Sequence, residues 1–221
     1  MIPWEHLDTA TMPDGGGDLR LMRRGQEYSI MTGAIELMNS RLSGSEEALA
    51  SLGAAQVGAR KGCRVLIGGL GMGFTLRAAL RDFGPDAAIV VAELVPEVVA
   101  WARGPVRAVH GDSLYDPRVS IHVGDVAEAV AQESWDAILL DVDNGPEGLT
   151  RRANDGLYDD AGLAAARRGL NPGGVLAVWS SAPHRAFSQR IRRSGLTVEE
   201  VSVRASRGKR GAKHTIWLGR R

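Results

Sequence analysis

The stretch at residues 65–80, VLIGGLGMGFTLRAAL, constrains the fold most, because an apolar run enters a glycine-spaced turn and leaves as a helix. The turn glycines are Gly69, Gly71 and Gly73. Glycine has no Cβ and tolerates φ > 0, so a ligand can approach bare backbone amides at a helix N-terminus. The pattern is typical of a nucleotide-binding turn, although three glycines also make an ordinary connection between a strand and a helix.

Acidic residues end the next apolar runs along the chain. Glu93 closes the run IVVAE, Asp125 closes VSIHVGD and Asp141 closes WDAILLD. The carboxyl ends of parallel strands share the edge of the sheet where ligands bind, so we expect these side chains to meet the glycine turn there. Glu93 is placed to accept both hydroxyls of a ribose. The structural alternatives are a surface glutamate after a strand, and an aspartate that caps its own loop.

Strands and helices alternate from residue 62 onward, which predicts an α/β fold with a parallel sheet and helices on both faces. The expected strands are 64–68, 88–93, 119–123, 136–141 and 175–180, and the expected helices are 74–82, 96–102, 125–131, 159–169 and 184–194. Two final strands, 197–204 and 214–219, are joined by a short polar loop and should form an antiparallel hairpin at the sheet edge.

The chain divides near residue 60. Before that point, a glycine-rich turn at 14–18 leads into short strands between residues 19 and 38, followed by a helix at 45–57 with Ser43 or Ser45 as its N-cap. We therefore expect a small N-terminal unit, residues 1–60, made of β structure and one helix. We expect residues 61–221 to form the second unit, which contains the parallel sheet.

Composition narrows the function classes. The 221 residues are 44% hydrophobic and carry a net charge of +1, which gives no general attraction to nucleic acid or membranes. The single cysteine, Cys63, excludes an internal disulfide and a cysteine zinc cluster. No apolar run approaches the roughly twenty residues that span a bilayer, and the N-terminus does not look like a signal peptide. A cytoplasmic location is the expectation.

These motifs together resemble a known family. The segments VLIGGLGMGFTLRAAL, VVAELVPEVVAWAR, DPRVSIHVGDVAEAV, WDAILLDVDNGPEGL and LYDDAGLAAARRGLNPGGVLAVWS are similar to the polyamine aminopropyltransferases, the spermidine synthase family, within the S-adenosylmethionine-dependent methyltransferase folds. The likeness covers residues 28–205. It implies a seven-stranded, doubly wound Rossmann-like sheet, a small N-terminal β domain, a homodimer, and S-adenosylmethionine or its decarboxylated form as co-substrate, with no metal.

The resemblance also implies roles for single residues. The turn from Gly69 to Gly73 would hold the methionine-derived part of the nucleoside, and Glu93 would bind the ribose. Asp125 would bind the adenine amino group. Asp141 would stand beside the reacting centre, where it orients the attacking amine, accepts its proton and stabilises the cationic product.

The chain departs from the family in the groups that would recognise a polyamine. Met72 replaces the aspartate that holds the ammonium of the aminopropyl group, and Asn144 replaces a second aspartate that binds the diamine. Asp143 and Glu147 are candidate substitutes, and we expect Asp143 to assist Asp141 in catalysis. Asn144 and Glu147 are assigned to the acceptor pocket.

The N-terminal motifs also differ. Glu36 stands where the family has a glutamine, and we assign it to the acceptor. Ser45, Glu46 and Glu47 stand in place of a tyrosine, a histidine and a glutamate. Tyr158 is a further candidate for the acceptor pocket, where an aromatic face can enclose a cation, although an aromatic residue near a strand end also suits the core.

Three functions follow from these residues. The first hypothesis is methyl transfer from S-adenosylmethionine to a small amine, because the loss of the acid at Met72 removes a countercharge for the decarboxylated co-substrate. The alternatives are aminopropyl transfer to a diamine or polyamine, and a nucleoside-binding partner subunit without catalysis.

Two other features carry no chemistry at this stage. The basic segment 204–213, RASRGKRGAK, contains no aromatic residue and is expected to be an exposed hairpin loop rather than a nucleic-acid site. The five histidines have no metal-like spacing. Among them, His184 is placed to reach the cleft.

Overall fold

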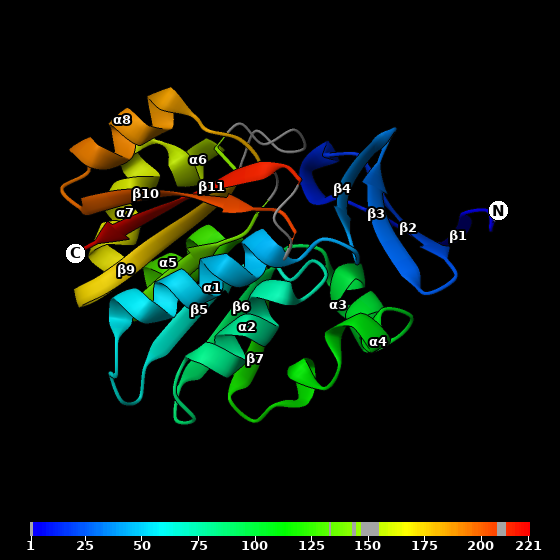
Figure 1. The fold of residues 1–221 in the computed structure, drawn as a ribbon, viewed down its shortest axis with the longest axis horizontal. Coiled ribbons are helices and arrows are strands. Elements are labelled where there is room, and N and C mark those ends of the chain that lie inside the picture. The colour runs from blue at the N-terminus through cyan, green and yellow to red at the C-terminus, as the bar shows by residue number, and fades with distance from the viewer. Residues whose placement is uncertain (1, 133, 143–144, 147–154, 207–210) are drawn as a thin grey trace.

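The computed structural model describes residues 2–132, 134–142, 145–146, 155–206 and 211–221. It contains a small antiparallel sheet near the N-terminus and a larger sheet flanked by helices (Figure 1). None of the helices in these described ranges has the length and apolar character needed to cross a membrane.

The small sheet has the strand order β1-β2-β3-β4. Its strands are β1 (Glu5–Thr11), β2 (Asp18–Arg24), β3 (Glu27–Thr32) and β4 (Ile35–Asn39), with a short 3-10 turn, η1 (Pro13–Gly15), after β1. Strand β1 was not predicted from the sequence. Most of its side chains are exposed and its pairing with β2 is interrupted by an irregularity between His6 and Asp8, so it lacks a clear apolar alternation.

The large sheet has the order β10-β11-β9-β8-β5-β6-β7, and confirms the predicted seven-stranded, mainly parallel sheet with an antiparallel C-terminal hairpin. Its strands are β5 (Arg64–Gly68), β6 (Ala88–Glu93), β7 (Val119–Val123), β8 (Trp135–Leu140), β9 (Leu170–Ser180), β10 (Thr197–Arg204) and β11 (Lys213–Arg220). Strands β5 to β9 run parallel to their neighbours within this set.

Helices cover both faces of this sheet, because apolar side chains of its buried strands point to both faces. Val65 and Ile67 pack on one face with α1, α2 and α3, whereas Leu66 packs on the other with α5, α7 and α8. The helices are α1 (Gly44–Val57), α2 (Phe74–Asp82), α3 (Pro96–Arg103), α4 (Arg107–His110), α5 (Val126–Gln132), α6 (Asp155–Tyr158), α7 (Asp160–Gly169) and α8 (Arg185–Arg193), with a 3-10 turn η2 (Ser113–Tyr115). The free thiol of Cys63 is buried in this core, and burial raises its pKa to about 12.

Helix α1 packs on the large sheet, although the predicted division at residue 60 grouped it with the small unit. A Cβ on Gly53 would lie 2.7 Å from Leu139 Cδ2, so the glycine lets the helix approach β8 closely. At the other end, Gly44 N donates to the carbonyl of Ala205 at 2.9 Å. These contacts hold residues 44–57 against the larger sheet, and the division of the chain near residue 60 stays a prediction.

One polar contact joins the small sheet to helix α3. Trp101 is buried, and its Nε1 donates a hydrogen bond of 2.7 Å to Asp8 Oδ2 in β1. Leu21 and Ile30 of the small sheet belong to the same apolar core as Trp101. The small sheet is therefore fixed over the carboxyl end of the parallel strands.

The turn after β5 is held against the ends of its two neighbours. Gly69 N donates to the Ala92 carbonyl at the end of β6, and Asp141 N donates to the Gly68 carbonyl, both at 2.9 Å. Gly69 has a φ of 89°, and a Cβ at this position would collide with the carbonyl oxygen of Asp141. Only glycine satisfies both the conformation and the close approach.

Replacing Gly69 by alanine should destabilise the protein more than replacing a glycine with the same type of backbone and open surroundings. Gly111 is that control, because its φ is 61° and nothing lies within 4 Å of the position that a Cβ would take. We expect Gly111→Ala to cost about 1–2 kcal/mol from backbone strain. Gly69→Ala should cost about 1–3 kcal/mol more because of the collision. Urea denaturation measures both, and equal losses would contradict this account.

Candidate active site

A pocket lies at the carboxyl edge of the parallel strands, between the two sheets. Its empty space is ≈ 850 Å³, part of it open to solvent, which is within the size range of small-molecule sites. The lining comes from both sheets: Met12, Leu19, Ile30, Leu37, Met38, Gly69, Gly71, Ala92, Glu93, Leu94, Val95, Val98, Gly124, Asp125, Val126, Asp141 and Val142.

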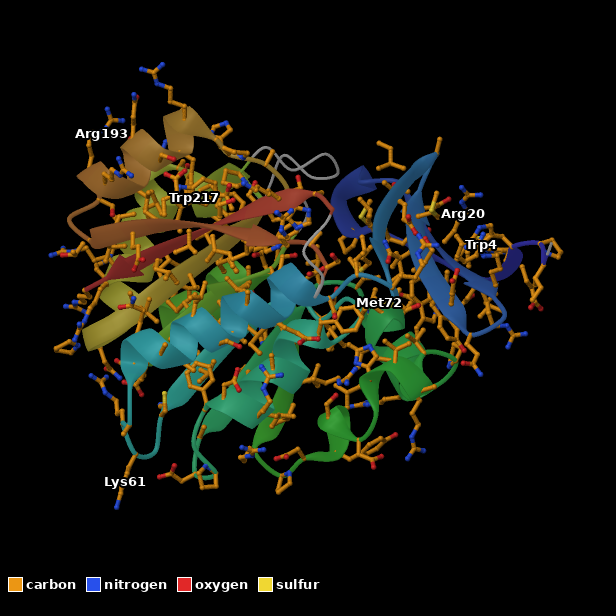
Figure 2. The ribbon with its side chains drawn as sticks, viewed as in Figure 1. Trp4, Arg20, Lys61, Met72, Arg193 and Trp217 are labelled. Carbon is orange, nitrogen blue, oxygen red and sulfur yellow. The ribbon has the colours of Figure 1, made fainter. Side chains whose placement is uncertain are left out.

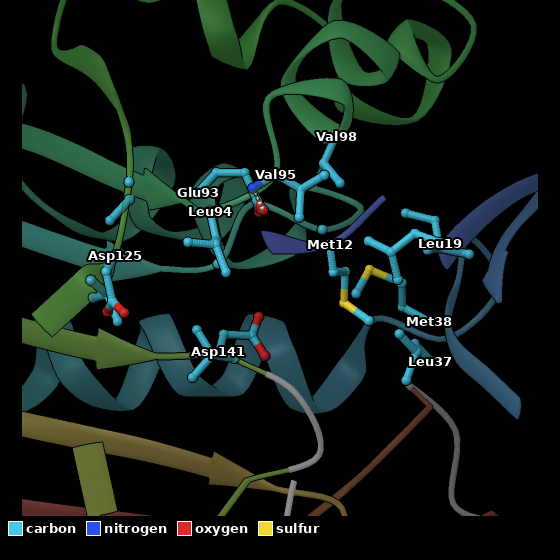
Figure 3. Close-up of a pocket in the computed structure, with 17 residues that line it drawn as sticks. Met12, Leu19, Leu37, Met38, Glu93, Leu94, Val95, Val98, Asp125 and Asp141 are labelled. Atoms are coloured by element: carbon cyan, nitrogen blue, oxygen red, sulfur yellow. Dashed lines mark hydrogen bonds between the residues drawn. The ribbon is translucent and has the colours of Figure 1, made fainter. Parts of the chain in front are cut away.

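The two sides of this pocket differ in chemistry. Figure 3 shows Glu93, Asp125 and Asp141 at the ends of the parallel strands, with Met12 and Met38 of the small unit across from them. The structure thus brings together five of the predicted site residues, Gly69, Gly71, Glu93, Asp125 and Asp141. The methionine and leucine side of the pocket was not predicted.

Glu93 ends β6 and is almost fully buried. Its Oε2 accepts from Leu70 N in the glycine turn and its Oε1 accepts from Val95 N in the next turn, both at 2.9 Å. Burial raises the pKa of this carboxyl, and the backbone donors oppose the shift. Each carboxylate oxygen has a second lone pair, so Glu93 can still accept hydroxyl groups from a ligand in the pocket.

Asp125 lies just before helix α5 and is partly exposed to the pocket. Its Oδ1 accepts from Ala127 N at 2.9 Å, which satisfies one free amide in the first turn of the helix. Gly124 N, next to it, donates to the Glu93 carbonyl at 2.9 Å. This bond keeps the ends of β6 and β7 in register, with Asp125 and Glu93 on the same side of the pocket.

Asp141 follows β8, and its carboxylate contacts the first turn of α2. The hydroxyl of Thr75 lies 2.6 Å from Asp141 Oδ2 and donates to it. The pKa of Asp141 is raised to about 7, first by burial and then by the negative charge of Glu46, while the Thr75 hydrogen bond opposes the shift. A carboxyl with this pKa can take up and release a proton near neutral pH, as a general base must.

The third glycine of the turn, Gly73, has a packing role in the structure. Gly73 caps α2 with a φ of 75°, and a Cβ there would collide with the ring of His110. It does not line the pocket, whereas Gly69 and Gly71 do. His110 is buried, and burial lowers its pKa to about 4. Gly73 is therefore required for packing against His110, and its assignment to the nucleoside stays a prediction.

Glu36 also lies outside the pocket. Its carboxylate accepts from Ser29 Oγ at 2.8 Å and pairs with Arg41 at 3.2 Å. These residues line a separate hollow of the small sheet, together with Trp4 and Arg20. Figure 2 shows Trp4 and Arg20 on this sheet. Leu37 and Met38 line the pocket, whereas Glu36 lines the separate hollow. Side chains along a strand alternate between the two faces of a sheet, and the pairing of β3 with β4 is irregular at this point. The predicted contact of Glu36 with the acceptor stays a prediction, and the structure places Glu36 away from Asp141's pocket.

The remaining candidates are Tyr158, His184 and the loop residues that follow Asp141. Tyr158 is buried with its ring edge-on to Phe187, and its hydroxyl lies 3.4 Å from the Val142 carbonyl, so it supports the pocket wall from the core side. His184 caps α8 by accepting from Phe187 N at 2.9 Å and does not line the pocket. The predicted residues Asp143, Asn144 and Glu147 lie outside the described residues.

Sequence reasoning missed two polar residues next to Asp141. Thr75 is buried in the first turn of α2, and Glu46 lies in the first turn of α1, with its carbonyl oxygen 3.3 Å from the Thr75 hydroxyl. For Thr75, the available signal was a threonine two residues after the last glycine of the turn. The resemblance placed Glu46 in a family motif but gave it no role, and its charge acts on Asp141 because α1 packs on β8 and α2.

Met72 is buried in the core that contains α2 and does not line the pocket. The position at which the resemblance implies an acid therefore carries an apolar side chain that packs inward. The turn therefore presents no carboxylate to a ligand from this position.

The comparisons with known proteins agree with the expected family. No family model matches the chain. A polyamine aminopropyltransferase of Mycobacterium tuberculosis strain H37Rv is 34% identical over 125 residues, which is 54% of this chain and 23% of that protein. The chain therefore matches about a quarter of the length of this curated relative.

Solved structures extend the similarity to almost the whole chain. A spermidine synthase from Thermotoga maritima has a TM-score of 0.77 at 16% identity and covers 97% of this chain and 72% of that one. A spermidine synthase in complex with the transition-state analogue AdoDATO gives the same values. The fold is that of the spermidine synthases. The chain itself resembles the spermidine synthase-like family, the polyamine aminopropyltransferases, in sequence as well as in fold.

The raised pKa of Asp141 predicts that Asp141→Asn stabilises the protein in alkaline but not in acidic solution. The folded state holds the proton more tightly than the unfolded chain, so wild-type stability falls as the pH rises from the ordinary value of 3.8 towards 7. Asparagine cannot ionise and escapes this loss. We expect Asp141→Asn to be more stable by about 1–3 kcal/mol near pH 8, and equally stable near pH 3.

Urea denaturation at the two pH values measures this difference. Loss of stability in the variant near pH 8, or the same difference at both pH values, would contradict the raised pKa.

Proposed function

We propose that the protein catalyses aminopropyl transfer from decarboxylated S-adenosylmethionine to an amine. The observation that best supports this proposal is that Asp141, a carboxylate with a pKa of about 7, lines the same pocket as Glu93 and Asp125. The similarity to polyamine aminopropyltransferases favours this reaction over methyl transfer, which was the first hypothesis from the sequence. The chain matches only part of those proteins, so the activity is a proposal for this chain.

The pocket suits an adenosyl group in one orientation. Glu93 would accept the ribose hydroxyls, Asp125 would accept the adenine amino group, and the glycine turn at Gly69 and Gly71, which lines the pocket, would face the tail of the nucleoside. This arrangement would leave the sulfonium beside Asp141. The methionine and leucine side chains of the small unit would exclude water from the reacting carbon, which strengthens electrostatic interactions in the pocket.

The reaction needs an unprotonated amine in line with the sulfonium. Asp141 would take a proton from the ammonium of the acceptor, leaving the N–H electron pair on nitrogen. The nitrogen would then form a bond to the aminopropyl carbon while the carbon–sulfur bond breaks and its electron pair stays on sulfur. The products are a secondary ammonium, the thioether methylthioadenosine and a protonated Asp141. Alignment of the two reactants supplies on the order of 7–11 kcal/mol in favourable cases.

Methyl transfer from S-adenosylmethionine is the second candidate, and the buried Met72 is the observation that favours it. No carboxylate at this position holds the ammonium of the decarboxylated form or repels the carboxylate of the ordinary form. The same pocket and the same base would serve both reactions.

Titration calorimetry with the two sulfonium nucleosides should separate these candidates. We expect at least a roughly tenfold preference for decarboxylated S-adenosylmethionine, a difference of about 1.4 kcal/mol, followed by aminopropyl transfer to a diamine in a product assay. A clear preference for S-adenosylmethionine with methylated product would support the second candidate. Binding without turnover on a broad panel of amines would favour a non-catalytic nucleoside-binding subunit and contradict the proposal.

The proposed ribose contact predicts that Glu93→Gln weakens the binding of methylthioadenosine. An amide in place of the carboxylate removes charge-assisted hydrogen bonds of about 1.5–3 kcal/mol, which corresponds to at least a roughly tenfold rise in Kd. Glu97→Gln is the matched control, because Glu97 is exposed on the next helix and does not line the pocket. Calorimetry measures both, and an unchanged Kd for Glu93→Gln would place the ribose elsewhere.

A homodimer, which the family resemblance implies, is part of this proposal. Sedimentation equilibrium of the full chain measures the mass in solution and tests it.

A further inference from the structure

Glu46 lies near the proposed base, Asp141, but comes from α1, the first α-helix of the described residues. Its helix α1 packs on β8 and α2, and Thr75 bridges the two elements. The Thr75 hydroxyl lies 2.6 Å from Asp141 Oδ2 and 3.3 Å from the carbonyl oxygen of Glu46. This contact fixes the first turn of α1 against the end of β8.

A chain of hydrogen bonds holds the Glu46 carboxylate from its other side. The hydroxyl of Ser45, which is fully buried, donates to Glu46 Oε2 at 2.7 Å. The same hydroxyl oxygen lies 2.8 Å from His214 Nδ1 in β11. Because the serine hydrogen is used for Glu46, His214 Nδ1 must carry a hydrogen and donate to Ser45. The Ser45 hydroxyl, which His214 orients, stabilises a negative charge on Glu46.

We propose that Glu46 and Asp141 form a carboxylate pair that shares one proton near neutral pH, and that Glu46 is the positioning residue which makes Asp141 a base for the transfer reaction. This inference rests on the proposed function for its chemical consequence. Glu46 does not line the pocket, so it acts on the substrate through Asp141.

The groups around the pair favour this sharing. The other charged or titratable side chains near Glu46 in the described residues are Glu47 on the same helix, which lies 3.9 Å from Arg81 of α2, and His214 on β11. Burial lowers the pKa of His214, which keeps it neutral at pH 7. No described basic side chain forms an ion pair with either carboxylate, since neither Glu46 nor Asp141 has a salt-bridge partner there.

Two like charges in a poorly solvated site cannot both be ionised without a large penalty, so one proton is retained. Burial raises the pKa of Glu46 as well as that of Asp141. The hydrogen bond from Ser45 favours the ionised form of Glu46, which leaves the proton on Asp141 for more of the pH range. Each unit by which the pKa of Asp141 rises makes it a roughly tenfold stronger proton acceptor towards the incoming ammonium.

The test is a carboxyl-carbon NMR titration of the full chain labelled in aspartate and glutamate, without any nucleoside. We expect Asp141 to titrate near 7 in the wild type. In Glu46→Gln the midpoint should fall by roughly one unit or more, because the neighbouring charge is gone. Glu47→Gln is the matched control on the same helical turn, and should leave the Asp141 midpoint in place.

Ser45→Ala provides a second variant with little change in volume, in case Glu46→Gln folds poorly. Loss of the hydroxyl donor makes the ionised form of Glu46 less stable, so the shared proton should move to Glu46 and the Asp141 midpoint should fall. An ordinary Asp141 midpoint in the wild type, or an unmoved midpoint in both variants, would overturn the pair.

The catalytic consequence has its own readout. In the aminopropyl transfer assay, the acidic limb of kcat/KM should move to lower pH in Glu46→Gln, together with the NMR midpoint. A shifted midpoint with an unmoved acidic limb would overturn the role of Glu46 in the reaction. Failure of the wild type to bind methylthioadenosine would count against the proposed function instead, and the NMR titration would still decide the pair.

Discussion

The carboxylate of Glu93 is the contact on which the pocket depends most. It is buried at the end of β6 and joins two turns, through Leu70 N after β5 and Val95 N before α3. A buried carboxylate is unfavourable unless hydrogen bonds satisfy it, and here backbone amides do so. The same bonds place the glycine turn and the start of α3 around a common space, and the Gly69 and Gly124 amides continue this arrangement to the neighbouring strands.

The two sheets contribute different chemistry to this space. Parallel strands deliver backbone amides and carboxylates at one edge, because their carboxyl ends coincide. The antiparallel small sheet delivers Met12, Leu19 and Met38, whose side chains have no charge. An adenosyl sulfonium needs both: acceptors for its ribose and adenine, and an apolar surface that keeps water from the electrophilic carbon. Neither sheet alone provides such a site.

Much of the larger unit could be predicted from local patterns. The buried strands β5, β6 and β8 have continuous apolar runs that end in glycine or acid, and the sheet places those ends together as expected. Strand β1 could not be predicted, because its side chains are mostly exposed and its pairing with β2 defines it. The packing of Gly73 against His110 could not be predicted, because His110 is distant in the sequence. Glu46 was missed for the same reason, since only tertiary packing brings α1 to Asp141.

The proposed nucleoside site is best tested by a crystal structure of the protein soaked with methylthioadenosine. The three acids predict both the pocket in which the ligand binds and its orientation there. We expect the ribose hydroxyls to lie on the Glu93 carboxylate, the adenine amino group on Asp125 and the sulfur beside Asp141. A nucleoside bound outside this pocket, a reversed orientation with adenine at Asp141, or an empty pocket at saturating ligand would contradict it.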